Sequence, residues 1–225
     1  MISRADRSMV AEWWRTVDHF LLGMILLLVL CGFLLSFAAS PPVAERIGLE
    51  ATHFTIRHAV YLVPSLALLI GLSFLTPKQV RRAALILFAI SIPLLLATLF
   101  LGADVKGSRR WISLAGFSLQ PSEFVKPAFV IISAWLFAEN TRRPEIPGNL
   151  FAIILFGIVA ALLIAQPDFG QTLLVGTVWG GMFFLAGMPW AWITVLGGLA
   201  VSGIVAAYFF FPHVAGRIDR FWTGS

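Results

Sequence analysis

Long apolar runs separated by short polar segments dominate the chain. A helix needs roughly 20 apolar residues to cross a bilayer, and these runs are continuous, without the alternation that strands show. Seven stretches qualify or come close, at about 20–39, 56–75, 83–101, 122–138, 150–165, 171–187 and 191–212. The pattern predicts an all-α, polytopic membrane bundle with about seven transmembrane helices. We expect one transmembrane domain over residues 1–225, in which 1–18 form a cytoplasmic N-terminal segment.

Composition agrees with a membrane protein. Of the 225 residues, 59% are hydrophobic and only 12% are charged, whereas a soluble domain carries roughly 25% charged residues. The sequence pI near 10.1 raises the question of nucleic-acid binding. The basic residues, however, lie in short clusters between apolar runs, where they act as topology signals and contact lipid headgroups. We therefore expect membrane lipids, and no nucleic acid, as partners.

The distribution of Lys and Arg predicts the orientation of the helices. Three arginines precede the first apolar run, against one in the next loop, and the first helix usually dominates. The later clusters at 78–82 and 142–143 agree, although over all loops the count is only eight inside against seven outside. We expect a multi-pass protein of the bacterial inner (cytoplasmic) membrane with its N-terminus in the cytoplasm. Lys106, Arg109 and Arg110 then lie in a short outer loop, against the rule, which indicates a purpose other than topology.

Two polar helix starts stand out because ionisable groups in a membrane helix are costly unless they are paired. In the first, Pro121 suits the first helical position, and Glu123 and Lys126 share one face three residues apart. The second start, at Gln166-Pro167-Asp168, repeats the order Gln-Pro-acid. Helix capping with a local ion pair explains both starts, and so does a shared polar pocket. The residues alone leave both interpretations open.

The sequence contains no recognisable metal-binding motif and no P-loop, GxSxG or HExxH pattern. We therefore predict no metal site. An enzyme built from these residues must work with carboxylates and basic phosphate clamps. A transporter would use the same polar groups, but it needs them to continue to the inner face. The inner halves of the apolar runs are nearly free of charge, which favours chemistry on one side.

Three segments together resemble the signature of the SEDS family of membrane proteins, which comprises FtsW, RodA and SpoVE. In chain order they are 107–112 (GSRRWI), 120–126 (QPSEFVK) and 166–170 (QPDFG), and the resemblance covers the whole chain. The segments 39–46 and 142–144 look most like the alphaproteobacterial FtsW branch.

The resemblance implies about ten helices and a peptidoglycan glycosyltransferase that polymerises lipid II into glycan strands during cell division. It implies a class B penicillin-binding protein and other division proteins as partners. It also implies an outer cavity, facing the periplasm, that binds substrate. The residues expected to form it are Lys106, Arg109, Arg110, Trp111, Gln120, Ser122, Glu123, Lys126 and Asp168.

The resemblance also bears on the catalytic residue. In the family, an outer loop that follows the seventh helix carries the aspartate regarded as catalytic, and its position lies beyond Ser225. The resemblance thus implies an N-terminal fragment that is inactive alone. A divalent cation, Mg²⁺ or Mn²⁺, is the one cofactor that chemistry at a pyrophosphate leaves open. A lipid II flippase, a RodA-type elongation polymerase and a scaffold that only recruits a transpeptidase are the alternatives.

Overall fold

The structure is a computed structural model that describes residues 8–105, 108–114, 117–210, 215–216 and 219. The chain forms two compact units, Met1–Val80 and Arg81–Ser225. Each unit is described by itself below. One transmembrane domain over residues 1–225 stays a prediction.

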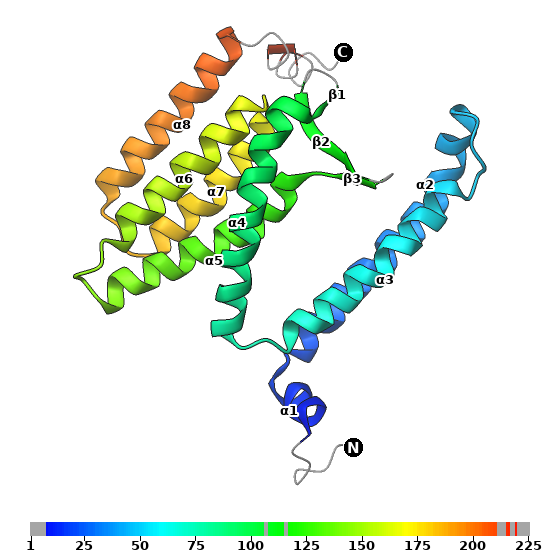
Figure 1. Cartoon of the computed structure of the whole chain (residues 1–225), viewed down its shortest axis with the longest axis horizontal. Helices are drawn as coiled ribbons and strands as arrows, with labels where there is room; N and C mark the ends of the chain where they lie inside the picture. Colours follow the sequence, from blue (N-terminus) through cyan, green and yellow to red (C-terminus); the bar gives the residue numbers. More distant parts are fainter. Residues whose placement is uncertain (1–7, 106–107, 115–116, 211–214, 217–218, 220–225) are drawn as a thin grey trace. The chain divides into compact units, whose positions relative to one another are not determined.

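The first unit contains α1 (Met9–Thr16), α2 (His19–Arg46) and α3 (His53–Ser73). The helices α2 and α3 pack against each other as a hairpin (Figure 1). The short helix α1 is capped by Ser8, whose Oγ accepts a hydrogen bond from the backbone N–H of Ala11 at 3.3 Å. The Nε1 of Trp13 donates to Ser73 Oγ at 2.7 Å, which joins α1 to the end of α3. The sequence predicted a cytoplasmic segment here but not its helix.

Helix α2 extends beyond the predicted end near residue 39. It continues through Pro41 and Pro42 to Arg46. A proline inside a helix removes one hydrogen bond and crowds the preceding turn, yet the helix runs through both prolines. It ends at Arg46, two residues before Gly48, whose φ of +74° is the left-handed conformation that glycine adopts without strain. The prediction was wrong by about two turns because a glycine after the helix, and not the proline pair, terminates it.

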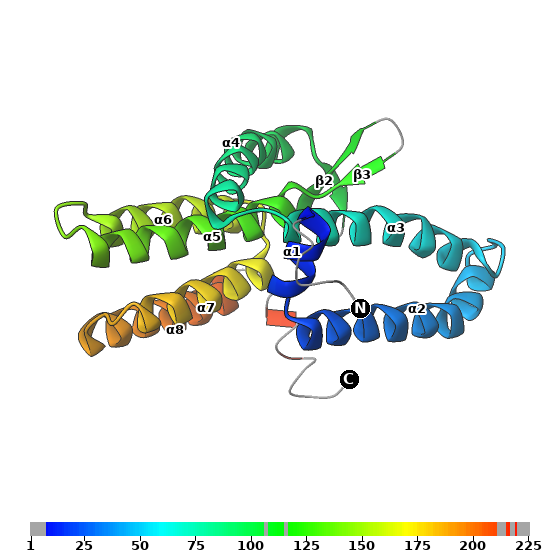
Figure 2. The ribbon, with the colours of Figure 1, turned by 90° about the horizontal axis from the view of Figure 1, so that it is seen from below.

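The second unit holds most of the apolar helices. After α4 (Pro77–Leu101), which begins just before the unit, come α5 (Pro121–Arg142), α6 (Gly148–Ala165), α7 (Phe169–Leu185) and α8 (Trp190–Phe210). Helices α5, α6 and α7 pack on one another and lie side by side in both ribbon views (Figures 1 and 2). A Cβ on Gly148 would collide with the Leu136 carbonyl oxygen, so the first residue of α6 must be small to approach α5 this closely.

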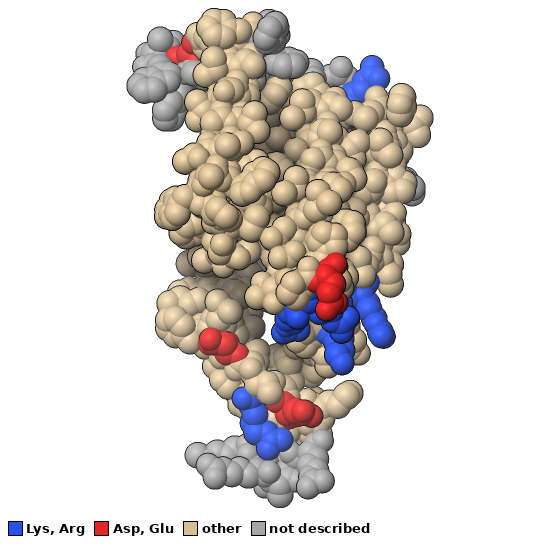
Figure 3. Space-filling view, turned by 90° about the vertical axis from the view of Figure 1, so that its left-hand side faces the viewer, with Lys and Arg blue, Asp and Glu red and all other residues tan. Residues whose placement is uncertain are grey.

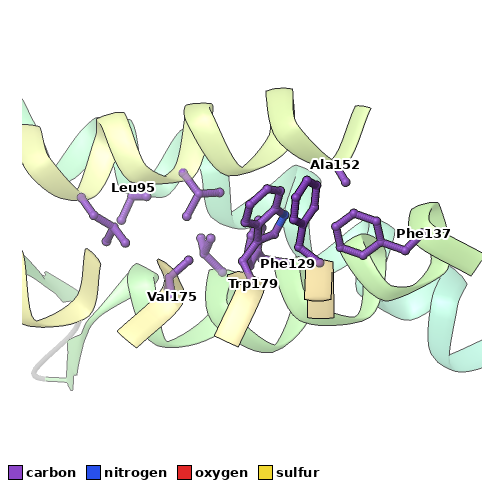
Figure 4. Close-up of a cluster of buried hydrophobic side chains, with 10 residues drawn as sticks. Leu95, Phe129, Phe137, Ala152, Val175 and Trp179 are labelled. Atoms are coloured by element: carbon purple, nitrogen blue, oxygen red, sulfur yellow. The ribbon is translucent and has the colours of Figure 1, made fainter. Parts of the chain in front are cut away.

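Aromatic side chains fill the space between these three helices (Figure 4). The ring of Trp179 on α7 stacks on the rings of Phe156 of α6 and Phe183 of α7, with centroid distances of 4.7 Å and 4.8 Å. Phe129 and Phe137 of α5 complete the cluster, and both are buried. Offset aromatic stacking adds to the energy of burial, so this cluster fixes α5 and α7 relative to each other.

A small antiparallel sheet occupies the segment between α4 and α5. Its strands are β1 (Ala103–Val105), β2 (Ser108–Leu114) and β3 (Phe117–Leu119), in the order β1-β2-β3. In the second pair Ile112 lies opposite Leu119 and Leu114 opposite Phe117. The sequence predicted only a short loop here. The three residues of β1 and of β3 are too few for alternation to be recognised, and the seven residues of β2 do not alternate between polar and apolar.

The described helices bear out a multi-pass membrane fold. Each of the seven predicted runs coincides with one of the helices α2 to α8. Five of them, α2 to α6, are long and apolar enough to cross a membrane, and α7 and the Trp190–Gly203 part of α8 are apolar but shorter. The all-α membrane fold is therefore confirmed, with one small sheet outside the helices. The number of spans stays a prediction.

Candidate functional site

The predicted polar residues come together at one end of the second unit. There the sheet meets the start of α5 and the connection between α6 and α7 (Figure 1). Both helices begin where the Gln-Pro-acid segments predicted, α5 at Pro121 and α7 just after Asp168.

An ion pair joins the sheet to the first turn of α7. The Nη1 of Arg110, on β2, donates to Oδ2 of Asp168 at 3.2 Å, although the two residues are 58 positions apart. The Asp168 side chain is only 5% exposed and that of Arg110 is 27% exposed. The other carboxylate oxygen of Asp168, Oδ1, accepts the Gln171 backbone N–H at 3.4 Å and so caps α7. The capping interpretation of Asp168 is therefore confirmed, and the same carboxylate also fixes an arginine, whereas the shared polar pocket stays a prediction.

A second polar group links α5 to α7. The Nζ of Lys126 donates to Glu123 Oε1 at 2.7 Å, which confirms the predicted pair, and to Gln171 Oε1 at 2.8 Å. Gln171 in turn approaches the same Glu123 oxygen with its Nε2 at 3.4 Å. Lys126 is 19% exposed and Glu123 is 50% exposed, so the ammonium lies deeper than its carboxylate.

Gln171 is a site residue that sequence reasoning missed. It carries no charge, so the rule that marks ionisable groups in membrane helices passes over it. Its spacing of three residues from Asp168 offered a signal, since both lie on one face of the first turn of α7. Through its backbone and side chain, Gln171 touches both ion pairs.

Gln166 holds the end of α6 against α4. Its side chain is 1% exposed, and its Nε2 donates to the Leu95 carbonyl at 3.3 Å and to the hydroxyl of Thr98. The Thr98 hydroxyl donates to the same Leu95 carbonyl at 2.6 Å. This buried network positions the segment that carries Asp168, only two residues further on.

The remaining predicted residues divide into those with contacts in the site and those without. The Nε2 of Gln120 donates to the buried Ser122 Oγ at 3.0 Å at the start of α5. Arg109 and Trp111 are exposed on β2, and no hydrogen bond or ion pair joins them to the other site residues that the structure describes. Lys106 lies outside the described residues. The outer cavity stays a prediction.

The divalent cation that the sequence leaves open is equally untested. Among the described residues, no group of three or more His, Cys, Asp and Glu side chains lies close enough to hold a metal ion.

These observations define a class: a multi-pass helical membrane protein in which paired charges gather where two helices begin. The pattern of the FtsW/RodA/SpoVE family, described as cell cycle proteins, matches residues 18–224. The chain belongs to this family, and the resemblance noted from its motifs is confirmed.

Individual relatives agree with this family assignment. The chain is 43% identical to the probable peptidoglycan glycosyltransferase FtsW of Caulobacter vibrioides, an alphaproteobacterium, over 97% of this chain and 56% of that protein. It is 32% identical to the corresponding Acinetobacter baylyi protein, over 92% of this chain and 52% of the relative. The chain thus spans about half the length of the curated relatives it matches.

Two solved structures share the fold. The crystal structure of the rod shape determining protein RodA of Thermus thermophilus superposes with a TM-score of 0.62 at 28% identity, over 83% of this chain and 60% of that chain. The second structure is described as the structural coordination of polymerization and crosslinking by a peptidoglycan synthase complex. It superposes with a TM-score of 0.70 at 27% identity, over 93% of this chain and 60% of that chain.

Proposed function

We propose that the protein containing this chain is a peptidoglycan glycosyltransferase that polymerises lipid II during cell division. The observation that carries the proposal is the paired cluster of Arg110, Asp168, Lys126, Glu123 and Gln171 where α5 and α7 begin. The names of the curated relatives support the glycosyltransferase class, and their FtsW designation favours division over a RodA-type role in elongation.

The proposed reaction is glycosyl transfer from an undecaprenyl-pyrophosphate donor. The 4-hydroxyl of the acceptor sugar attacks C1 of the donor sugar, the bond from C1 to the pyrophosphate oxygen breaks, and the lipid pyrophosphate leaves with the bonding electrons. A general base takes the hydroxyl proton. In this proposal the base is an aspartate outside residues 1–225, as the resemblance implies. Preorganised cations stabilise the charge that develops on the leaving group.

This chain would supply part of that positive field. Arg110 is held by Asp168 and remains 27% exposed, so it is fixed in direction but still accessible to a ligand. Arg109 precedes it on the same strand and is exposed. Lys106 would extend the field along the loop. Glu123, Lys126 and Gln171 would keep α5 and α7 in register and the region polar, with Trp111, Gln120 and Ser122 lining the substrate cavity. If a Mg²⁺ or Mn²⁺ ion assists, it would neutralise the pyrophosphate.

For the location of the protein, we propose the bacterial inner membrane, with the N-terminus in the cytoplasm and the cluster facing the periplasm. The arginines at the start of α4 and at the end of α5 support this orientation, because cytoplasmic loops carry an excess of Lys and Arg. A cysteine introduced for Ser118, which is exposed on β3, should react with a membrane-impermeant maleimide from outside intact spheroplasts, in a variant without Cys31.

The proposed partners are lipid II as substrate, a class B penicillin-binding protein as transpeptidase, and other division proteins. The similarity to a solved peptidoglycan synthase complex that couples polymerization and crosslinking supports the transpeptidase partner.

Glycan synthesis from purified fluorescent lipid II tests the proposal. We expect the whole protein, in detergent with its partner, to make glycan strands. Arg110→Ala should lower the rate about 10²–10³-fold, as removal of a preorganised charge donor does. Strand formation without a bilayer would exclude a flippase as the sole function. Near-normal polymerisation by Arg110→Ala would show that Arg110 plays no such role, and glycan synthesis that survives Glu123→Ala while partner binding fails would favour the scaffold.

A further inference from the structure

A second feature lies at the other end of the same helices. A cavity of about 440 Å³ opens between the last turns of α5 and α7. Its wall is apolar, and the side chains on α5 are small, namely Ala134 and Ala138, both exposed. From the α7 side come Met182 and Leu185. Such a wall suits a slender apolar chain lying along the helices.

The rim of this cavity carries a positively charged side chain. Arg142, the last residue of α5, is the one charged residue that lines it. Its side chain is exposed, and among the described residues no carboxylate forms an ion pair with it. The other polar lining residue, Thr141, already donates its hydroxyl to the Phe137 carbonyl at 3.3 Å. The cavity therefore joins an apolar wall to an arginine without an acidic partner.

Neighbouring arginines add to this charge. The nearby acid Glu139 is occupied, since it pairs with Arg143 at 3.3 Å and accepts the Trp135 Nε1 hydrogen bond at 3.2 Å. Arg81 lies over the ring of the same Trp135, 4.8 Å from its centroid, which brings the start of α4 to this region. Basic side chains gather beside acidic ones at this end of the molecule (Figure 3). Arg82, which follows Arg81 in the chain, is exposed.

We propose that this cavity binds an anionic phospholipid. Its acyl chain would lie along the alanine wall between α5 and α7, and its phosphate would be bound by Arg142, with Arg81 and Arg82 beside it. Arginine forms paired hydrogen bonds to phosphate, and basic pockets between membrane helices bind anionic headgroups. In the orientation proposed above, this lipid belongs to the inner leaflet. The site does not depend on the glycosyltransferase activity, because it lies at the opposite end of α5 from Glu123 and Lys126.

The occupant follows from the combination of features. A free phosphate needs no apolar wall, and a zwitterionic lipid would place its own cation near Arg142. An anionic phospholipid matches the wall and the cation together.

Native mass spectrometry of the purified whole protein tests this site. The protein is reconstituted in vesicles of phosphatidylglycerol and phosphatidylcholine with identical acyl chains, extracted in detergent, and its retained lipids are counted. We expect phosphatidylglycerol to be retained in preference. Arg142→Gln should lower this preference about fivefold, the effect of one basic residue near a membrane surface. Arg46→Gln, at the last residue of α2, is the matched control and should leave the preference unchanged.

A second pair of variants tests the apolar wall. Ala138→Leu fills the cavity from an exposed helix position and should reduce retention of both lipids. Ala161→Leu, at an exposed position on α6 outside the cavity, should not. Equal retention of the two lipids by the unaltered protein would overturn the proposal. So would identical behaviour of each variant and its control, or displacement of the retained lipid by millimolar inorganic phosphate.

Discussion

The two ends of α5 use the same kinds of charge in opposite ways. At the start of the helix, Arg110 and Asp168 pair across 58 residues of sequence, and the carboxylate is 5% exposed. At the end, Arg143 pairs with Glu139 one turn away, and the arginine is 66% exposed. A local, exposed pair adds little to stability, whereas removing one member of a buried pair leaves an uncompensated charge. The number of ion pairs is therefore a poor guide to stability, and the separation and burial of the partners distinguish the two ends of α5.

Of the variants that test this comparison, Asp168→Ala is expected to lower stability most. The change removes the partner of Arg110 and the cap of α7, and should lower the free energy of unfolding by roughly 3 kcal/mol. This is the low end for buried pairs, because Arg110 remains partly exposed. Chemical denaturation in detergent measures the loss. Asp168→Asn, which keeps an oxygen for the Gln171 N–H, should lose less. Equal stability of the alanine variant and the unaltered protein would contradict the role given to this pair.

An intermediate effect is expected from Gln171→Leu. Lys126 would lose one of its two side-chain partners while partly buried, which should cost about 1–3 kcal/mol of stability. If Gln171 connects the two ion pairs, the Leu variant should also slow polymerisation in the whole protein. Thr177→Val, further along α7, removes a hydroxyl that only bonds to the Leu173 carbonyl and serves as the control. An effect no larger than that of the control would mean that Gln171 is dispensable.

The smallest effect is expected at the other end. Arg143→Ala breaks the pair with Glu139, an i,i+4 contact of an exposed arginine, worth about 0.3–0.5 kcal/mol. The melting temperature should barely change, and the rate of glycan synthesis should stay the same. A loss as large as that of Asp168→Ala would show that burial and separation do not distinguish the two ends.

The sequence could predict the features that depend on residues close to one another along the chain. The apolar runs located α2 to α8, and the spacing of Glu123 and Lys126 predicted their ion pair. Asp168 was predicted as a helix cap because the backbone N–H that it accepts, that of Gln171, lies only three residues away. All of these features arise within one or two helical turns.

Features that depend on the packing of distant segments escaped prediction. No local pattern connects Arg110 to Asp168, or Gln166 to Thr98, because tertiary packing brings these residues together. Gln171 carries no charge, so the rule for ionisable groups passed over it, and only its spacing from Asp168 offered a signal. The strands were missed because β1 and β3 are too brief to show alternation and β2 does not alternate polar and apolar residues. The family resemblance named Arg110 and Asp168 as site residues but did not pair them with each other.

The central claim is that Arg110 and Asp168 act as a pair at the site of glycan synthesis. Exchanging the two charges tests it most directly, by lipid II polymerisation with the whole protein carrying Arg110→Asp, Asp168→Arg, or both. We expect each single exchange to abolish most of the rate, since it brings two like charges together. The double exchange should recover folding but not the rate, because the cation leaves the strand that faces the substrate. Near-normal polymerisation by either single variant would contradict the account.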